Sequence, residues 1–119
     1  MPEAPRTRDR ELSEWVYAAE SSIHGTGLFA RRAIPAGTYI GTYWGPEAKR
    51  NGRYVLWVND DPADDEAWQG RSGRNLLRWL NHSADCNAEF DGYDLYALRD
   101  IQPGEEITFY YGDEFHAQL

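Results

Sequence analysis

The segment NHSADCN, residues 81–87, gathers hydrogen-bonding side chains directly after the large apolar residues Trp79 and Leu80. A surface loop does not need the tryptophan. An interior segment does not favour amide and imidazole groups unless they have hydrogen-bond partners. The pattern therefore predicts that the chain enters the interior here and holds something polar.

Two kinds of site do not fit this segment. Ser83 and His82 are not expected to form a nucleophile and base pair, because adjacent residues rarely point at one another. A zinc site needs several His or Cys ligands at suitable spacing. However, His24 and His116 are isolated from His82, and Cys86 is the only cysteine. We therefore predict that this chain holds no metal.

Paired carboxylates are the next candidate, in the stretch GEEITFYYGDEF, residues 104–115. Glu105 and Glu106 could suggest the acid pair of a glycosidase. Neighbouring residues on a strand point to opposite faces, however, so these two cannot share one site. By the same alternation, at most one of Tyr110 and Tyr111 faces a given pocket. None of these signals identifies a reaction by itself.

Glycines in two further stretches allow a ligand to come close to the backbone. In IHGTGLFA, residues 23–30, glycines flank Thr26, but the third glycine and the following helix of a dinucleotide loop are missing. This stretch is either a ligand loop or a plain tight turn. In GTYWG, residues 41–45, Tyr43 either lines a pocket or lies half-buried in a strand.

The elements that must position these residues are short segments rich in Val, Ile, Tyr, Trp and Phe, which predict a mainly β protein. NLLRWL offers one or two helical turns, and DEAW, residues 65–68, could form a short helix. Residues 1–12 are charged and contain proline, which predicts a flexible tail. The predicted strands are WVYAAE, GLFARRA, TYIGTYW, RYVLWVN, YDLYALR and EITFYY.

The chain contains one internal repeat. ARRAIPAGTYIGTYWG, residues 30–45, aligns without gaps on ALRDIQPGEEITFYYG, residues 97–112, with seven of sixteen positions identical. In each copy a strand ends in Ile and turns through a glycine, Gly37 or Gly104, which is expected to supply a positive φ. Two copies are too few for a solenoid, so a recurrent strand–turn–strand unit accounts for the repeat.

The composition limits the protein to one domain of 119 residues with a single modest core. No apolar run approaches the roughly 20 residues of a membrane helix, and the charged start lacks the apolar region of a secretory signal. The net charge of −8 argues against a nucleic-acid binder and suits a basic partner. The run NDDPADDE is either a solvated acidic loop or a docking surface for a Lys/Arg-rich peptide. The single cysteine fits a reducing, intracellular location.

Taken together and in order, these stretches resemble the SET domain, the family of lysine methyltransferases that use S-adenosylmethionine. The family's order is a GxG turn, a YxG strand, an RFINHSCxPN segment and a GEELTxDYG close. Here they read GTGLFA, YWG, RWLNHSADCN and GEEITFYYG. The resemblance implies a SET-domain fold over residues 13–115, with several short β-sheets and a C-terminal pseudoknot, followed by a tail at residues 116–119.

The resemblance also assigns roles to individual residues. It makes Tyr111 the catalytic tyrosine and places Tyr43 in the lysine channel, where it would also serve catalysis. Phe109 falls at the position that tunes the number of methyl groups, and phenylalanine there predicts more than one. The residues assigned to the cofactor are His24, Gly25, Thr26, Gly27, Tyr54, Asn81 and His82.

The chain departs from the family at Ala84, Cys86 and Tyr110, none of which is a predicted catalytic group. A more consequential departure is that no cysteine-rich post-SET module follows the GEEITFYYG close. We expect the substrate channel to be completed either by residues 113–119, with Phe115 as the available aromatic, or by a second copy of the chain in a homodimer.

The resemblance implies transfer of methyl groups from S-adenosylmethionine to a lysine of a Lys-rich basic protein, histone or histone-like. The enzyme would act in the cytoplasm, or on chromatin or a nucleoid through that substrate, with no direct nucleic-acid or membrane contact. Two alternatives remain: a non-catalytic SET-fold module that binds cofactor or a basic peptide, and an interaction domain without cofactor. Retention of Tyr111, Asn81 and His82 favours the enzyme.

Overall fold

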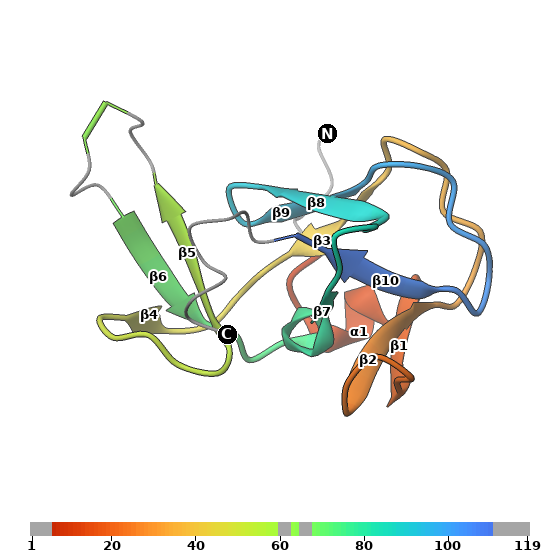
Figure 1. The fold of residues 1–119 in the computed structure, drawn as a ribbon, viewed down its shortest axis with the longest axis horizontal. Coiled ribbons are helices and arrows are strands. Elements are labelled where there is room, and N and C mark those ends of the chain that lie inside the picture. Colours follow the sequence, from red (N-terminus) through yellow and green to blue (C-terminus); the bar gives the residue numbers. More distant parts are fainter. Residues whose placement is uncertain (1–5, 60–62, 65–67, 111–119) are drawn as a thin grey trace.

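Three small β-sheets form most of the structure (Figure 1). This computed structural model describes residues 6–59, 63–64 and 68–110. The first sheet has the order β1 (Val16–Glu20), β2 (Thr26–Ala30), β10 (Glu106–Phe109) and β7 (Asn81–His82). The second has the order β3 (Tyr39–Thr42), β9 (Asp94–Ala97) and β8 (Ala88–Asp91), and the third β4 (Glu47–Ala48), β6 (Trp68–Ser72) and β5 (Val55–Asn59). Among the described residues, the helical segments are α1 (Asp9–Leu12) and the 3₁₀ helix η1 (Leu76–Trp79).

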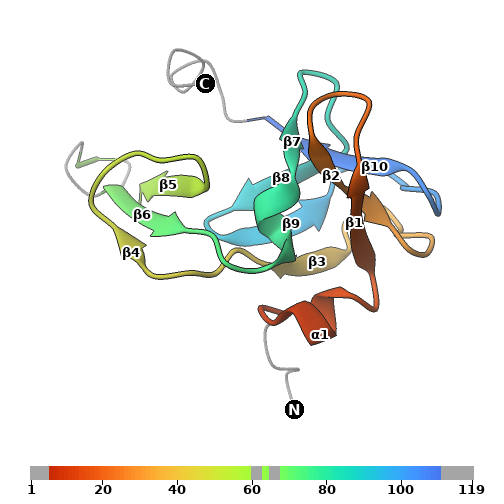
Figure 2. The same cartoon turned by 90° about the horizontal axis from the view of Figure 1, so that it is seen from below.

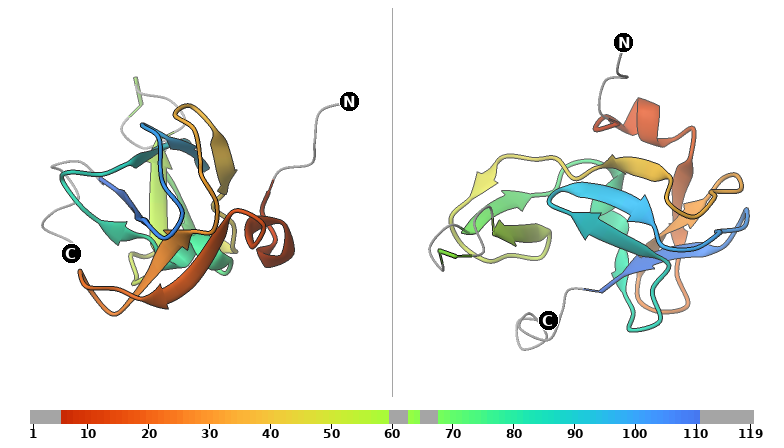
Figure 3. Two further views of the ribbon diagram at one scale, coloured as in Figure 1. Left: turned by 90° about the vertical axis from the view of Figure 1, so that its right-hand side faces the viewer. Right: turned by 90° about the horizontal axis from the view of Figure 1, so that it is seen from above.

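The β4–β6–β5 sheet projects to one side of the other two sheets (Figures 1 and 3). The core is built mainly from the other two sheets, with contributions from Leu12 of α1, Leu77 of η1 and Leu56 of β5. Figure 2 shows α1 beside β3 and the start of β1. The prediction of a mainly β fold of short strands with little helix is confirmed.

Each of the six predicted strand segments contains a strand, namely β1, β2, β3, β5, β9 or β10. NLLRWL forms η1, as a helical turn was predicted there. Four short strands, β4, β6, β7 and β8, were not predicted. Most of the predicted helix DEAW lies outside the described residues, and its last residue, Trp68, begins β6.

The start of the chain differs from the predicted tail. Asp9–Leu12 is helical, and Leu12 is fully buried. The carbonyl of Arg6 accepts a hydrogen bond from the Thr42 N–H (2.9 Å), and the Asp9 carboxylate accepts one from the N–H of Leu76 at the start of η1 (2.7 Å). Residues 6–12 are therefore packed onto β3 and η1, because one apolar and one capping side chain anchor an otherwise charged segment.

The two copies of the internal repeat pair with each other. Ile34 and Ile101, equivalent positions in the alignment, exchange two N–H···O hydrogen bonds of 2.8 Å each. The positive φ predicted for the turn glycines is confirmed, at 83° for Gly37 and 84° for Gly104. Their N–H groups donate to equivalent carbonyls of the opposite copy, Gly37 to Ala97 (2.8 Å) and Gly104 to Ala30 (2.7 Å). The repeat thus joins the first sheet to the second.

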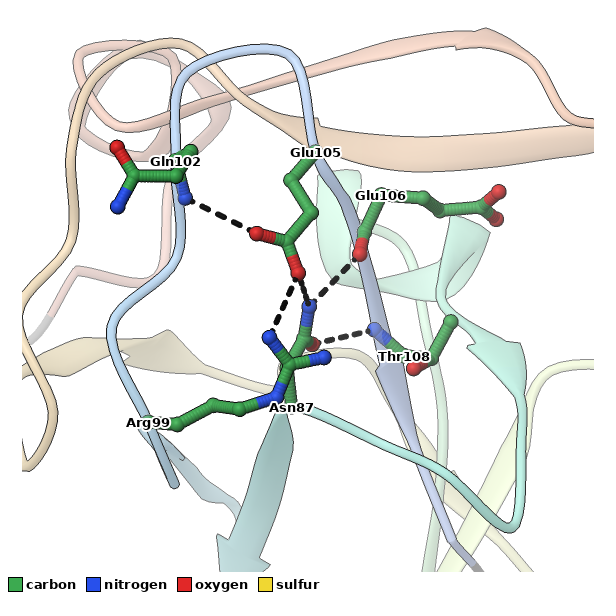
Figure 4. A network of polar contacts seen from close by, with 6 residues as sticks. All are labelled: Asn87, Arg99, Gln102, Glu105, Glu106 and Thr108. Atoms are coloured by element: carbon green, nitrogen blue, oxygen red, sulfur yellow. Dashed lines mark hydrogen bonds and ion pairs between the residues drawn. The ribbon is translucent and has the colours of Figure 1, made fainter.

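Strand β10 lies between β2 and β7, antiparallel to β2 and parallel to β7. The buried side-chain amide of Asn87 lies beside β10 and bonds to its main chain, donating to the Glu106 carbonyl (2.8 Å) and accepting from the Thr108 N–H (2.9 Å) (Figure 4). The segment from Asn81 to Asn87 therefore holds β10 through its main chain at one end and through a side-chain amide at the other. This is the threaded arrangement expected of the pseudoknot.

Glu105 and Glu106 make contacts on opposite sides, as strand alternation predicts (Figure 4). Glu105 accepts hydrogen bonds from the Gln102 N–H (3.1 Å), the Asn87 amide (3.1 Å) and the Arg99 guanidinium (3.0 Å). The Gln102 N–H lowers the pKa of Glu105, and Asn87 and Arg99 add to this, while partial burial opposes it. The ionised form of Glu105 is therefore favoured in the folded protein.

We expect Glu105→Gln to lower the free energy of unfolding by about 1 kcal/mol near pH 7, a modest loss because the ion pair to Arg99 is partly exposed. The folded pKa of Glu105 is lowered, so its contribution is present above the unfolded value of about 4.3 and is lost as pH falls through the folded value. Urea unfolding of both proteins from pH 7 to pH 3 should show the difference shrinking below about pH 4.

Glu89→Gln is the matched control, because Glu89 is exposed on β8. Its free energy of unfolding should follow that of the wild type across the same pH range. A Glu105→Gln protein that is as stable as the wild type at pH 7 would contradict the proposed stabilisation by this network.

Candidate functional site

A cavity of about 700 Å³ lies among three segments of the chain. Its walls come from the loop between β1 and β2, the segment that leads into β5, and the end of η1 where it runs into β7. It is large enough for a nucleoside-sized ligand, since small-molecule pockets span about 300–1,000 Å³. The lining residues are 23–26, 51–55, 57 and 78–82.

Most of the predicted cofactor residues line this one cavity, although they are far apart in the sequence: His24, Gly25, Thr26, Tyr54, Asn81 and His82. Gly27 does not line it. A Cβ at Gly27 would lie 2.4 Å from a carboxylate oxygen of Glu106, so this glycine makes room for Glu106. Tyr111 and Phe115 lie outside the described residues, and their predicted roles stay predictions.

Arg53, Trp57, Arg78 and Trp79 also line the cavity, and no motif predicts them as site residues. Arg78 and Trp79 belong to the same RWLNHSADCN stretch as Asn81 and His82, so their position in the sequence was the available signal. Arg53 and Trp57 reach the cavity only because the segment around β5 packs beside η1, which local sequence does not reveal.

The cavity differs in charge from the rest of the chain. The net charge of the protein is −8, yet the described lining residues include two arginines, two histidines and no carboxylate. The Arg78 guanidinium donates to the carbonyls of Arg74 (2.7 Å) and Asn75 (2.9 Å) and lies over the Trp79 ring. No carboxylate among the described residues neutralises it. The cavity therefore suits a ligand with an anionic group and an aromatic or apolar part.

His82 connects the cavity to the C-terminal strand. It pairs in parallel register with Phe109, and its ring lies 4.8 Å from that of Tyr110. The next N–H along the chain, that of Ser83, donates to the Phe109 carbonyl (2.9 Å). The end of β10 and Tyr110 therefore lie close to the wall of the cavity.

Residues 25–112 match the sequence model of the SET domain. The chain belongs to the SET-domain family. It is 32% identical, over 82% of its length, to the histone-lysine N-methyltransferase trr of Drosophila melanogaster. To the human histone-lysine N-methyltransferase 2B it is 30% identical over 93% of its length. The chain spans 5% of the length of each of these relatives.

A solved structure, that of the methyltransferase domain of human histone-lysine N-methyltransferase SETMAR, has the same fold as this SET domain. The TM-score is 0.68 at 20% sequence identity, over 85% of this chain and 45% of that one. In the described part of the SET domain, no helix is long and apolar enough to cross a membrane. Residues 6–59, 63–64 and 68–110 also contain no group of three His, Cys, Asp or Glu side chains that could hold a metal ion.

Tyr43 lies behind the cavity wall rather than in it. It is buried, and its hydroxyl donates to the main-chain carbonyl of Tyr54, a lining residue. Its ring packs edge-to-face on Phe90, which packs edge-to-face on Phe109. In this SET domain, Tyr43 therefore positions Tyr54, and its assignment to the lysine channel and to catalysis stays a prediction.

Gly73 provides the space that Tyr43 occupies, since a Cβ at Gly73 would lie 2.3 Å from the Tyr43 hydroxyl. We expect Gly73→Ala to displace the ring, break the hydrogen bond to Tyr54, and lower the free energy of unfolding by about 1–3 kcal/mol. Urea unfolding measures this loss. Gly52→Ala is the control: its Cβ would meet only Val55, at 3.4 Å, so stability should change by less than about 1 kcal/mol. Equal stabilities of the two variants would contradict the packing argument.

Proposed function

We propose that this SET domain is a protein-lysine N-methyltransferase. It transfers methyl groups from S-adenosylmethionine to a lysine of a basic protein, histone or histone-like, and adds more than one methyl group. The observation that carries the proposal is the convergence of the HGT loop, Tyr54 and the Asn81–His82 pair on one cavity. These are residues that the resemblance assigns to the cofactor, and they come from three distant parts of the sequence.

The chemistry of the cavity fits this cofactor. Arg53 and Arg78 suit its carboxylate, and the rings of Tyr54 and Trp79, packed edge-to-face at 5.7 Å, suit its adenine and apolar parts. Gly25, with a φ of 44° and no atom within 4 Å of where a Cβ would lie, leaves the loop backbone open to a ligand. When bound, S-adenosylmethionine supplies an electrophilic methyl group on a sulfonium.

The protein must present lysine as a neutral amine, although free lysine has a pKa of about 10.4. The buried rings of Tyr43 and Phe109 and the partly buried ring of Phe90 form an apolar cluster at β10, and a channel beside them would disfavour the charged ammonium. Tyr111, the residue after Tyr110 in the sequence, would orient the amine through its hydroxyl. Residues 113–119, with Phe115, or a second copy of the chain would complete the channel.

The partners follow from charge. A net charge of −8 favours a Lys-rich protein and disfavours direct contact with nucleic acid. The matched relatives are named histone-lysine methyltransferases, which supports a histone or histone-like substrate. We place the activity inside the cell, in the cytoplasm or at chromatin or a nucleoid, and without a metal.

The second candidate is a non-catalytic SET-fold module that binds cofactor or a basic peptide. The observation behind it is the cavity itself, whose described lining accounts for binding of a ligand whether or not transfer follows. Labelled S-adenosylmethionine and a panel of basic proteins distinguish the two functions. Transfer of label to protein identifies the enzyme, whereas binding without transfer identifies the module.

We expect Tyr111→Phe to reduce methyl transfer at least a hundredfold while the affinity for S-adenosylmethionine changes less than about threefold, because the hydroxyl orients the amine and not the cofactor. Transfer of label and calorimetric titration measure the two quantities. Tyr110→Phe is the control at the adjacent position, which alternates to the other face of an extended chain. Undiminished transfer by Tyr111→Phe would remove Tyr111 from the catalytic role.

We expect the wild type to convert its lysine to the di- or trimethyl form and Phe109→Tyr to stall at fewer methyl groups. Phe109 is buried against Phe90 and carries no hydroxyl that could hold a water in the channel. The difference is about one hydrogen bond, or around tenfold in the rate of the later steps. Mass spectrometry of a substrate peptide over time follows each species. A wild type that stops at one methyl group with ample cofactor contradicts the prediction.

A further inference from the structure

Glu106 carries a carboxylate that no step of the proposed function uses. It accepts hydrogen bonds from Ser21 Oγ, at 2.8 Å to each carboxylate oxygen, and from Asn81 Nδ2 at 2.9 Å. No lysine, arginine or histidine among the described residues pairs with it. Gly27 provides the space for this carboxylate, which therefore lies between the β1–β2 loop and β7.

The amide of Asn81 has a defined orientation. Its Nδ2 group has two hydrogens, and the nearest acceptors are Glu106 Oε2 (2.9 Å) and the His24 carbonyl (3.0 Å). Ser21 Oγ (3.1 Å) and the Thr26 carbonyl (3.4 Å) lie slightly farther away. With the amide turned over, its oxygen would face the acceptor oxygens of Glu106, His24 and Thr26. Nδ2 therefore points into the protein, and Oδ1 is the group that Asn81 can offer to a ligand in the cavity.

Glu106 also sets the direction of the Ser21 hydroxyl. A carboxylate only accepts hydrogen bonds, so Ser21 donates its one proton to Glu106. Its oxygen is then left to accept the Ile23 N–H (2.9 Å), and the Ser21 N–H donates to the Gly25 carbonyl (2.7 Å). One carboxylate thereby fixes both the loop that carries His24 and Gly25 and the amide that faces it.

We propose that Glu106 is a positioning residue for the cofactor site. Through its hydrogen bonds to Ser21 and Asn81, it holds the Asn81 Oδ1 as an acceptor for an N–H donor on the ligand. This inference rests on the proposed function for the identity of the ligand. S-adenosylmethionine and its product S-adenosylhomocysteine each carry two such donors, the α-amino group and the adenine amino group.

The test is calorimetric titration of the full chain with S-adenosylhomocysteine and two analogues, one without the α-amino group and one without the adenine amino group. In the wild type, loss of the amino group that bonds to Asn81 should weaken binding roughly tenfold, which is about one hydrogen bond. Glu106→Met replaces the carboxylate with a side chain of similar volume that cannot accept a hydrogen bond. In this variant, loss of the same amino group from the ligand should weaken binding less than about twofold. Glu106→Gln, which keeps one acceptor oxygen, should give an intermediate ratio.

Glu105→Met is the matched control: the same substitution at the adjacent residue, whose contacts lie on the other face of β10. It should lower stability and leave both ligand ratios at the wild-type values. A positioning role predicts the altered ratio only at Glu106, whereas general damage to the fold would change both variants alike. Glu106→Met that keeps the wild-type ratios for both analogues, or equal changes in the two variants, overturns the proposal.

A wild type that does not bind S-adenosylhomocysteine overturns the proposed function itself, and that outcome is distinct from binding with unexpected ratios. If Glu106→Met does not fold, Asn81→Ala is tested in its place. Because this variant lacks the Oδ1 acceptor, it should bind S-adenosylhomocysteine and the analogue without the bonded amino group about equally well. Asn81→Ala that still distinguishes both analogues from S-adenosylhomocysteine as the wild type does would refute the inference.

Discussion

The structure depends on the placement of β10 between β2 and β7. A central strand must satisfy its N–H and C=O groups on both edges, and the main chain of β2, β7 and Ser83 supplies most of the partners. The Asn87 amide supplies two more, bonding to the Glu106 carbonyl and the Thr108 N–H. Because neighbouring side chains on β10 alternate, Glu105 fastens this strand to the Asn87–Arg99 side while Glu106 reaches the cavity side. One strand thus connects the stability of the fold to the geometry of the site.

The predictable parts of the fold are those in which the side chains of the segment itself favour the observed structure. The strands of TYIGTYW and EITFYY follow from β-branched and aromatic residues, and both copies of the repeat follow from an Ile and a turn glycine. The strands β4, β6, β7 and β8 are two to five residues long and rich in Gly, Asn, Asp and Glu. They become strands through pairing, and local propensity does not reveal pairing. The packing of α1 was not predicted, because its two anchoring residues, Asp9 and Leu12, stand in a segment that is otherwise mostly charged.

The same distinction applies to the site. The HGT loop and the Asn81–His82 pair are predictable because ordered motifs mark them, whereas Arg53 and Trp57 join the cavity only through the position of the β4–β6–β5 sheet. Tyr43 illustrates the limit of a motif, since its hydroxyl holds the carbonyl of Tyr54 behind the wall. A motif therefore identifies which residues gather at a site, and packing decides which of them face the ligand.

The proposed function requires two ligands, a basic protein and a cofactor with a carboxylate, and these favour surfaces of opposite charge. A basic protein is attracted over distances of about 10 Å by the net charge of −8. The carboxylate of the proposed cofactor would be repelled by an acidic side chain beside it, and the described lining of the cavity holds arginines and histidines but no acid. The carboxylate of Glu106 lies behind Asn81, a lining residue of the cavity. It accepts hydrogen bonds from Ser21 and Asn81, which cover it. A ligand in the cavity would therefore meet the amide oxygen of Asn81 in place of a carboxylate, which is what the proposed function requires of an acidic chain.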